Sequence, residues 1–295
     1  MNIRRIECFL AVVDLGTVTA AAQSLFLAQP ALSRQLQTLE QELDLKLFDH
    51  QRNRLSLTPA GRELVPLARQ LLSNARSVKA AASSWKDGRI KRLYISATAA
   101  TINELIAPFI TTLPDSDPLL LTVEAPHFNM LHLLHDGIDM VVSPTAIEGD
   151  VASLYLGQAP LRAYVSPDHP WARAQRQTIA LDELVQHELI LPGRQSVSRL
   201  QLDLAVARAG LAYQSIIECG QAATIQALAV SGRGIGIVTD LPRYGAYDLH
   251  ILDAPGSPNT YLGVDLYAAW SHEHYSTPVL GGIAARMRDY LLRRF

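Results

Sequence analysis

The sequence predicts an α/β protein with a small helical head and a larger body of alternating strands and helices. Residues 1–58 hold three amphipathic helical patterns and a short hairpin pattern, whereas the chain from residue 91 holds short apolar runs separated by helical segments. Charge divides in the same way. Residues 1–92 hold 14 Lys and Arg against 8 Asp and Glu, and residues 93–295 hold 12 against 20. A basic head on an acidic body indicates a nucleic-acid contact confined to the N-terminus.

Length and composition favour a globular protein of two or three compact units. The 295 residues are 48% hydrophobic and 18% charged, which is enough for a core in each unit. No stretch approaches 18 consecutive apolar residues, and the run from Cys8 to Val13 is too short for a secretory signal. The two cysteines, Cys8 and Cys219, lie far apart and in apolar surroundings, which excludes a disulfide framework. We therefore expect a cytoplasmic protein with no membrane segment.

The first two predicted helices are short and amphipathic. Apolar residues spaced three and four apart from Ile3 to Val13 predict a helix that ends before Gly16. Thr17 can cap a second helix, whose inward face carries Ala21 and its neighbours. These small side chains allow another helix to approach closely.

A third helix begins near Pro30, which suits a first helical turn because its missing N–H is not needed there. With Leu32 pointing inward and about 100° per residue, the leucines at 36, 39 and 43 share its side. The outward face is then polar and nearly uncharged. The candidate DNA-contacting residues of this helix are Gln29, Pro30, Ser33, Arg34, Gln37 and Thr38. Arg, Gln and Ser side chains read base edges in the major groove, and an ordinary solvated helix is the alternative interpretation.

The segment after this helix predicts a short hairpin wing. A polar turn from Asp49 to Arg54 separates Leu47 and Phe48 from the alternating run that begins at Leu55. Arg52 and Arg54 at its tip suit contact with phosphates or with the minor groove.

The stretch from residue 9 to residue 61 resembles the winged helix-turn-helix of the LysR-type transcriptional regulators. The matched positions are Phe9, Ala21, Ala22, Leu25, Gln29, Pro30, Ser33, Leu39, Glu40, Leu47, Phe48, Leu57, Thr58 and Gly61. Three positions depart from the family pattern: Ala28 replaces a capping serine, Asp44 a turn glycine, and His50 a common arginine. The resemblance implies a DNA-binding domain over residues 1–58.

Thr58 and Pro59 form a helix start, and a seven-residue apolar repeat follows. The repeat contains Leu64, Ala68, Leu71, Ala75, Val78, Ala82 and Trp85. Such a seam predicts pairing with another helix, and the alternative is a helix that lies on its own domain. In the LysR family this helix mediates dimerisation, so we expect a linker and dimerisation helix over residues 59–88, with a hinge at Gly88.

Eight apolar runs in the body predict strands that alternate with helices in a mostly parallel α/β arrangement. The runs cover residues 93–97, 119–123, 139–143, 161–165, 188–192, 215–219, 234–238 and 264–270. The body resembles the effector domain of the LysR family, which is akin to type 2 periplasmic binding proteins. That resemblance also rests on the segment from Gly137 to Met140 and on His169 with Pro170. It implies an effector-binding domain over residues 89–295 with two Rossmann-like subdomains, one of residues 89–160 and 265–295 and one of residues 161–264.

Candidate effector contacts follow the predicted strands, because ligands of such sheets bind at the carboxyl ends of strands and at helix N-termini. The candidates are Thr98, Thr101, His127, Arg194, Ser196 and Thr224. Hydroxyls, free backbone N–H groups and the Arg194 charge would suit a small anion, and we expect a carboxylate. Simple helix capping is the alternative interpretation for each hydroxyl.

We expect neither a metal site nor a cofactor. The histidines at 127, 132, 135, 272 and 274 lack a metal-binding motif, and residues 231–238 do not match the dinucleotide fingerprint. The expected function is a LysR-type, effector-responsive transcription regulator and not an enzyme. Its expected partners are a palindromic double-stranded operator, a second copy in a homodimer or homotetramer, and RNA polymerase as a further candidate. The alternative is an enzyme or solute-binding protein fused to a DNA-binding head.

Overall fold

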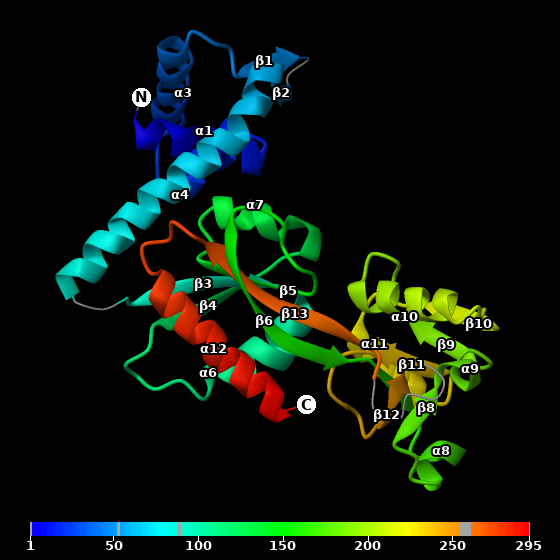
Figure 1. Cartoon of the computed structure of the whole chain (residues 1–295). Coiled ribbons are helices and arrows are strands. Elements are labelled where there is room, and N and C mark those ends of the chain that lie inside the picture. The colour runs from blue at the N-terminus through cyan, green and yellow to red at the C-terminus, as the bar shows by residue number, and fades with distance from the viewer. Residues whose placement is uncertain (1, 52–53, 88–89, 254–260, 295) are drawn as a thin grey trace.

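The computed structural model of the chain describes residues 2–51, 54–87, 90–253 and 261–294. Figure 1 shows a small head in blue, a long helix that leaves it, and a body of two parts. We call residues 3–57 the head. The unit around a five-stranded sheet is called the first subdomain, and the unit around a six-stranded sheet is called the second subdomain.

The head contains three helices and a hairpin. Its elements are α1 (Ile3–Leu15), α2 (Val18–Ser24), α3 (Gln29–Leu43), β1 (Phe48–Gln51) and β2 (Arg54–Leu57). Gly16 ends α1 in the left-handed conformation with φ 72°, where a glycine has no steric penalty. Thr17 then caps α2 by accepting a hydrogen bond from the N–H of Ala20 at 3.1 Å, so the predicted cap is confirmed.

One apolar core joins the three helices of the head. Phe9 of α1, Ala21 of α2, and Leu32 and Leu39 of α3 are buried in it, together with Leu47 before the hairpin. The leucines of α3 therefore face inward as the helical spacing predicts, and the opposite side of α3 is left to solvent.

The long helix α4 (Pro59–Asp87) also belongs partly to this core. Ala68 and Leu72 are buried there, with Leu64 and Leu71 packed against them. The predicted pairing seam is therefore wrong over its first part, because the head itself covers that face. No helix of the described residues, α4 included, has the length and apolar character needed to cross a membrane.

The first subdomain is built on a sheet with strand order β4-β3-β5-β13-β6. Its strands are β3 (Arg92–Ala97), β4 (Leu119–Glu124), β5 (Met140–Ser143), β6 (Val151–Pro160) and β13 (Gly263–Ser271). Its helices are α5 (Ala99–Thr101), η1 (Ile102–Ile106), α6 (Ala107–Ile110), η2 (His127–Asn129), α7 (Met130–His135) and α12 (Thr277–Arg294). The helix α12 packs its apolar face on this sheet, with Leu280, Ile283 and Met287 buried against Leu266 and Trp270.

The second subdomain is built on a sheet with strand order β10-β9-β11-β7-β12-β8. Its strands are β7 (Arg162–Val165), β8 (Thr178–Ala180), β9 (Glu188–Leu191), β10 (Ser215–Glu218), β11 (Ile235–Val238) and β12 (Tyr247–Leu252). Its helices are α8 (Pro170–Arg173), α9 (Leu181–Leu184), α10 (Val197–Arg208) and α11 (Ala222–Val230).

Both sheets are mixed, which corrects the expectation of a mostly parallel arrangement. The chain passes between subdomains along β6 and β13, which pair antiparallel over their length and run side by side from one part of the body to the other (Figure 1). At the crossing, the N–H of Leu161 donates to the carbonyl of Leu262 at 2.8 Å. A hydrogen-bonded two-stranded ribbon therefore connects the subdomains, and the space beside it can form a cleft.

Candidate DNA-binding face and effector cavity

The helix α3 presents a polar face away from the core of the head. Its exposed residues include Gln29, Pro30, Arg34 and Gln37, and Ser33 and Thr38 are half-buried beside them. The hydroxyl of Thr38 donates to the carbonyl of Arg34 at 2.8 Å, so its proton is directed back into the helix. The residue types and their exposure suit entry into a major groove.

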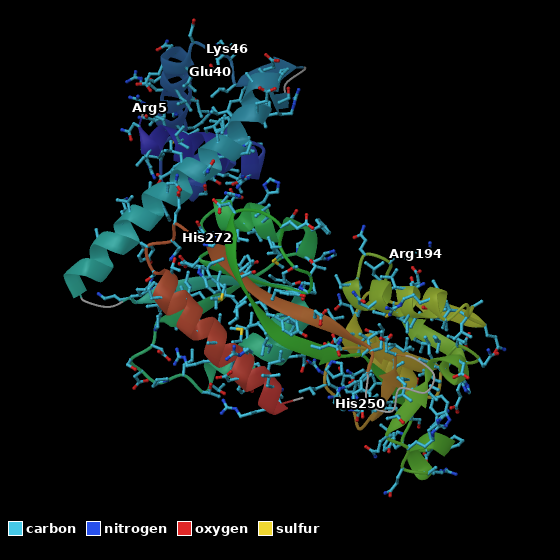
Figure 2. All side chains as sticks on the ribbon, in the orientation of Figure 1. Arg5, Glu40, Lys46, Arg194, His250 and His272 are labelled. Atoms are coloured by element: carbon cyan, nitrogen blue, oxygen red, sulfur yellow. The ribbon has the colours of Figure 1, made fainter. Side chains whose placement is uncertain are left out.

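The polar residues on the other side of α3 have partners within the head. Arg5 of α1 donates from Nε to the side-chain oxygen of Gln35 at 3.3 Å and pairs with Glu42 at 2.6 Å. Figure 2 labels Arg5 in the head together with Glu40 and Lys46. Two glutamines of one helix thus have different surroundings, because Gln35 fixes α3 to α1 while Gln37 points to solvent.

Glu40 holds the wing in place relative to α3. Its carboxylate accepts hydrogen bonds from the N–H groups of Leu47 at 2.8 Å and Phe48 at 3.3 Å, and from Lys46 at 3.0 Å. Burial alone would raise the pKa of Glu40, but these hydrogen bonds outweigh it and lower the pKa. The ionised side chain therefore fixes the start of the hairpin against the third helix.

Two of the three departures from the family pattern have visible consequences. Ala28 stands at the N-cap of α3 without a side-chain cap, and Asp44 ends this helix in the left-handed conformation at φ 52°. Asp tolerates that conformation better than most residues, although less well than glycine. Among the predicted wing residues, Arg52 and the side chains of His50 and Arg54 lie outside what the structure describes.

A cavity of about 500 Å³ lies between the two subdomains. Residues 98–101 after β3 and 124–128 at the end of β4 line it from the first subdomain, and residues 195–198 at the start of α10 line it from the second. Val264 and Leu266 of the connecting strand β13 add an apolar wall. The carboxyl ends of two parallel strands and the start of α10 therefore meet at one space, as expected for α/β ligand sites.

Four of the six predicted effector residues line this cavity: Thr98, Thr101, His127 and Ser196. The hydroxyls of Thr98 and Thr101 lie 3.0 Å apart. Thr224 is exposed and is not part of the lining, nor is Arg194. Arg194 instead points toward Glu218, with 3.6 Å between Nε and Oε1.

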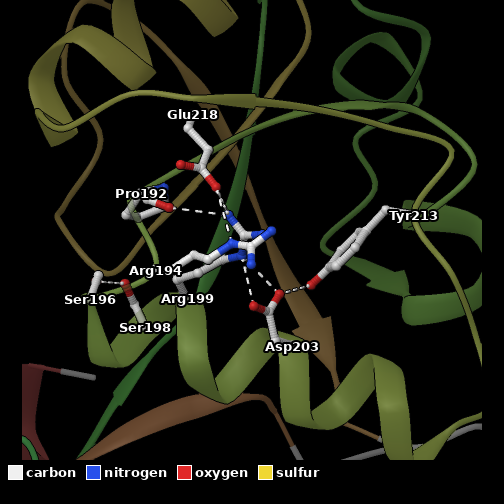
Figure 3. A network of polar contacts seen from close by, with 8 residues as sticks. All are labelled: Pro192, Arg194, Ser196, Ser198, Arg199, Asp203, Tyr213 and Glu218. Carbon is white, nitrogen blue, oxygen red and sulfur yellow. Dashed lines mark hydrogen bonds and ion pairs between the residues drawn. The ribbon is translucent and has the colours of Figure 1, made fainter.

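A buried arginine, Arg199 of α10, organises the segment that carries Ser196. It donates to Asp203 at 2.8 Å, to the carbonyl of Pro192 at 3.3 Å and to Glu218 at 3.4 Å. Figure 3 shows these contacts converging on its guanidinium, with Tyr213 donating to Asp203. Burial raises the pKa of Tyr213, and its hydrogen bond to Asp203 adds to this effect. The network ties α10 to β10 and to the segment that follows β9.

An ion pair crosses from one subdomain to the other at the cavity. Arg243 Nη2 of the second subdomain lies 2.8 Å from Glu104 Oε1 of the first, and Glu104 lines the cavity. The side chain of the buried Gln226 accepts from the N–H of Arg243 at 2.7 Å and donates to the carbonyl of Leu241 at 3.0 Å. Burial raises the pKa of the neighbouring Asp240. The negative charge of Glu104 raises this pKa further, whereas the positive charge of Arg243 lowers it. Arg243 is thus held firmly by its own subdomain while it reaches across to the other.

Comparison with known proteins identifies the class. A family model described as "Bacterial regulatory helix-turn-helix protein, lysR family" matches residues 3–62, and one described as "LysR substrate binding domain" matches residues 86–294. The chain belongs to the LysR family. It is a DNA-binding transcription regulator with an effector-binding domain, and not an enzyme.

Sequence relatives agree with this membership, and a solved structure shares the fold. The nitrogen assimilation regulatory protein nac of Escherichia coli is 28% identical over 249 residues, which are 81% of this chain and 79% of that protein. The HTH-type transcriptional regulator TfdT of Cupriavidus pinatubonensis is 32% identical over 199 residues, 65% of this chain and 85% of that protein. The crystal structure of CbnR, a LysR family transcriptional regulator, has a TM-score of 0.71 at 22% identity and covers 98% of this chain and 99% of that one. This structural likeness extends over head, linker helix and body.

Sequence reasoning missed several residues of the cavity. Glu104, Glu124, Gln195, Ser198 and Thr239 also line it. Glu124 directly follows the strand predicted over residues 119–123, and this position was the one sequence signal that could have identified it. Glu104 lies more than one turn into a helical segment, and only the fold brings it to the cleft.

Proposed function

We propose that this LysR-family regulator reads a palindromic operator with α3 and responds to a small effector bound between its subdomains. The main support is the exposed polar face of α3 beside a wing that Glu40 fixes in place. One solved relative, full-length CbnR, has a structure described as complexed with its target DNA, at a TM-score of 0.72 and 22% identity. We assign DNA binding to residues 1–58, pairing to residues 59–88 and effector binding to residues 89–295. A regulator that reads chromosomal DNA acts in the cytoplasm of a bacterial cell.

The first test compares polar side chains on the two sides of α3. Arg34→Ala and Gln37→Ala should each cost about 1 to 3 kcal/mol at a site selected from random duplexes, and should relax preference at one base pair. Gln35→Ala is the matched control, because Gln35 lies on the side of α3 that faces α1 and accepts a hydrogen bond from Arg5. Fluorescence anisotropy on selected and scrambled duplexes measures both effects. Equal losses on the two duplexes for Arg34→Ala would remove that residue from base readout.

We place the dimer contact on the part of α4 that the head leaves uncovered. Leu67 and Val78 are 63% and 69% exposed, and their spacing of eleven residues sets them on one side of a helix. An exposed apolar stripe on a long helix suits pairing with the same helix of a second copy. Two joined heads would then read two half-sites of one operator.

Val78→Glu should convert the dimer to monomers, because a charge without a partner is costly to bury in a helix pair. Lys79→Glu, at the next position and also exposed, should leave the assembly intact. Sedimentation velocity distinguishes the two states. An unchanged sedimentation coefficient for Val78→Glu would place the contact elsewhere.

For the effector, we retain a carboxylate as one of its groups and revise its partners. The side chain of Ser196 makes no cap hydrogen bond to α10, so backbone N–H groups at the start of this twelve-residue helix can bind an anion. The hydroxyls of Thr98 and Thr101 lie across the cavity. We leave Arg194 and Thr224 out of the site. Closure of the cleft on the effector would shift the equilibrium between an open and a closed arrangement. The size of that shift is set by the difference in the effector's affinity for the two arrangements.

A further inference from the structure

The charge of the cavity wall is negative. Its lining includes Glu104 and Glu124, and no lysine or arginine is found among the described residues that line it. This differs from the sequence-based picture, in which Arg194 supplied a positive charge. An effector with only negative groups would meet the carboxylate of Glu124 here, and like charges at close range are unfavourable.

The two glutamates differ in what they can still bind. Glu104 already pairs with Arg243 across the cleft. The side chain of Glu124 makes no hydrogen bond or ion pair to any residue in the described part of the chain, and Glu124 is exposed at the end of β4. Glu124 is therefore the carboxylate with free acceptors at the cavity.

The surroundings of Glu124 define the rest of a ligand. The backbone beside it is fixed, since the N–H of Ala125 donates to the carbonyl of Ala97 at 3.0 Å. Phe128 lines the same side and is 62% exposed, so an aromatic face is available to an apolar group or a cation. The hydroxyl of Ser196 and the start of α10 line the opposite subdomain. One end of the cavity thus suits a cation and the other an anion.

We propose that the effector is a small zwitterion of the amino-acid class, with its ammonium group bound by Glu124 and its carboxylate at the start of α10. This inference rests on the proposed effector function of the cavity and adds the ammonium as the group that determines specificity. The volume of about 500 Å³ is within the usual range for small-molecule sites and accommodates a free amino acid. Glu124 is a binding residue in this assignment, and the Glu104–Arg243 pair beside it stays intact.

The test uses the full-length chain and matched probes. The free protein amino acids are screened by thermal shift, each beside the carboxylic acid that lacks its amino group, such as L-leucine beside 4-methylpentanoate. Hits are measured by calorimetry on the wild type, on Glu124→Gln and on Glu148→Gln, a control at an exposed glutamate of the same subdomain. At least one amino acid should bind, and removal of its ammonium group should weaken binding roughly tenfold or more.

Glu124→Gln should weaken the amino acid roughly tenfold and should leave the deaminated acid unchanged or bound more tightly, because a repelling charge is gone. Glu148→Gln should change neither constant by more than about twofold. Equal affinity of wild type for an amino acid and its deaminated acid would overturn the ammonium assignment while leaving the cavity as the effector site. Binding that Glu124→Gln does not alter would overturn the role of that residue. A screen in which no amino acid binds would overturn the inference, and the α3 variants would still test operator reading separately.

Discussion

Arg199→Ala should destabilise the second subdomain by about 3 kcal/mol, because it removes a buried cation from between two carboxylates. The Arg199 side chain is 4% exposed and contacts Asp203 and Glu218. Its guanidinium also lies over the ring of Tyr213 at 5.8 Å, a contact that adds to the loss. Asp203 and Glu218 keep partial solvent access, which holds the cost at the lower end of the range for broken buried pairs.

Arg194→Ala is the matched control, since Arg194 points to the same Glu218. Its side chain is 83% exposed and the pair distance is 3.6 Å, so the change should be below about 0.5 kcal/mol. Denaturant unfolding followed by tryptophan fluorescence measures both variants, with Trp171 in the core of this subdomain as a reporter. Equal and small effects would show that the network does not hold the subdomain together.

Arg199→Ala should also affect the cavity. Arg199 bonds to the carbonyl of Pro192, and residues 195–198 follow directly as part of the cavity wall. Loss of that anchor frees the segment that positions Ser196. The contrast with Arg194 shows how two arginines five residues apart can have different roles: one supports the wall of the site, and the other lies on the surface.

The head could be predicted well from the sequence because its signals are local. Helical spacing of apolar residues, the cap at Thr17 and Pro30 in the first turn each depend on a few neighbouring residues. The start of α4 was equally visible. The packing of α4 on the head could not be predicted, because the spacing of Ala68 and Leu71 fits a helix that pairs with a second copy and a helix that packs on its own head equally well.

The strands that the sequence did not predict were missed for one physical reason. The strand β6 lies at the edge of its sheet and exposes alternate residues, with Gly157 interrupting its apolar pattern. The strand β12 alternates buried and partly buried residues such as Leu249 and His250, and β8 has only three residues. Continuous apolar runs identify fully buried strands such as β5 and β11, whereas half-exposed strands carry a weaker signal.

The position of the candidate effector cavity could be predicted from the sequence, but its charge could not. Strand ends and helix starts identified Thr98, Thr101 and Ser196, because the topology of α/β sheets places such segments on one edge. Glu104 and Arg243 are far apart in sequence, and their pairing depends on how two subdomains meet. The sequence therefore favoured Arg194 as the local charge, and the folded cavity presents glutamates instead.

The junction between the wing and α4 leads to the last prediction. Gly61 is buried in the first turn of α4, where a Cβ atom would stand 2.2 Å from the carbonyl oxygen of Leu47 and 3.0 Å from Leu57 Cδ2. The same turn is fixed by Thr58, whose hydroxyl accepts from the N–H of Gly61 at 2.9 Å and donates to the carbonyl of Lys46 at 2.6 Å. The nearest atom belongs to the backbone of Leu47 and not to a flexible side chain, so a small adjustment cannot relieve the contact, and α4 must move away from this segment to admit a methyl group.

Gly61→Ala should therefore destabilise the head by about 3 kcal/mol, the upper part of the range for overpacking. It should also lower operator affinity, because the start of the wing is bonded to α3 through Glu40 and moves with this junction. Gly282→Ala is the control: Gly282 lies in the helix α12 with no atom within 4 Å of its added Cβ. That change should stabilise its helix by up to about 1 kcal/mol and leave DNA binding unchanged. Thermal unfolding and anisotropy on the selected duplex measure the two outcomes. If Gly61→Ala melted and bound DNA like Gly282→Ala, the close packing of α4 on the hairpin would not be what positions the wing.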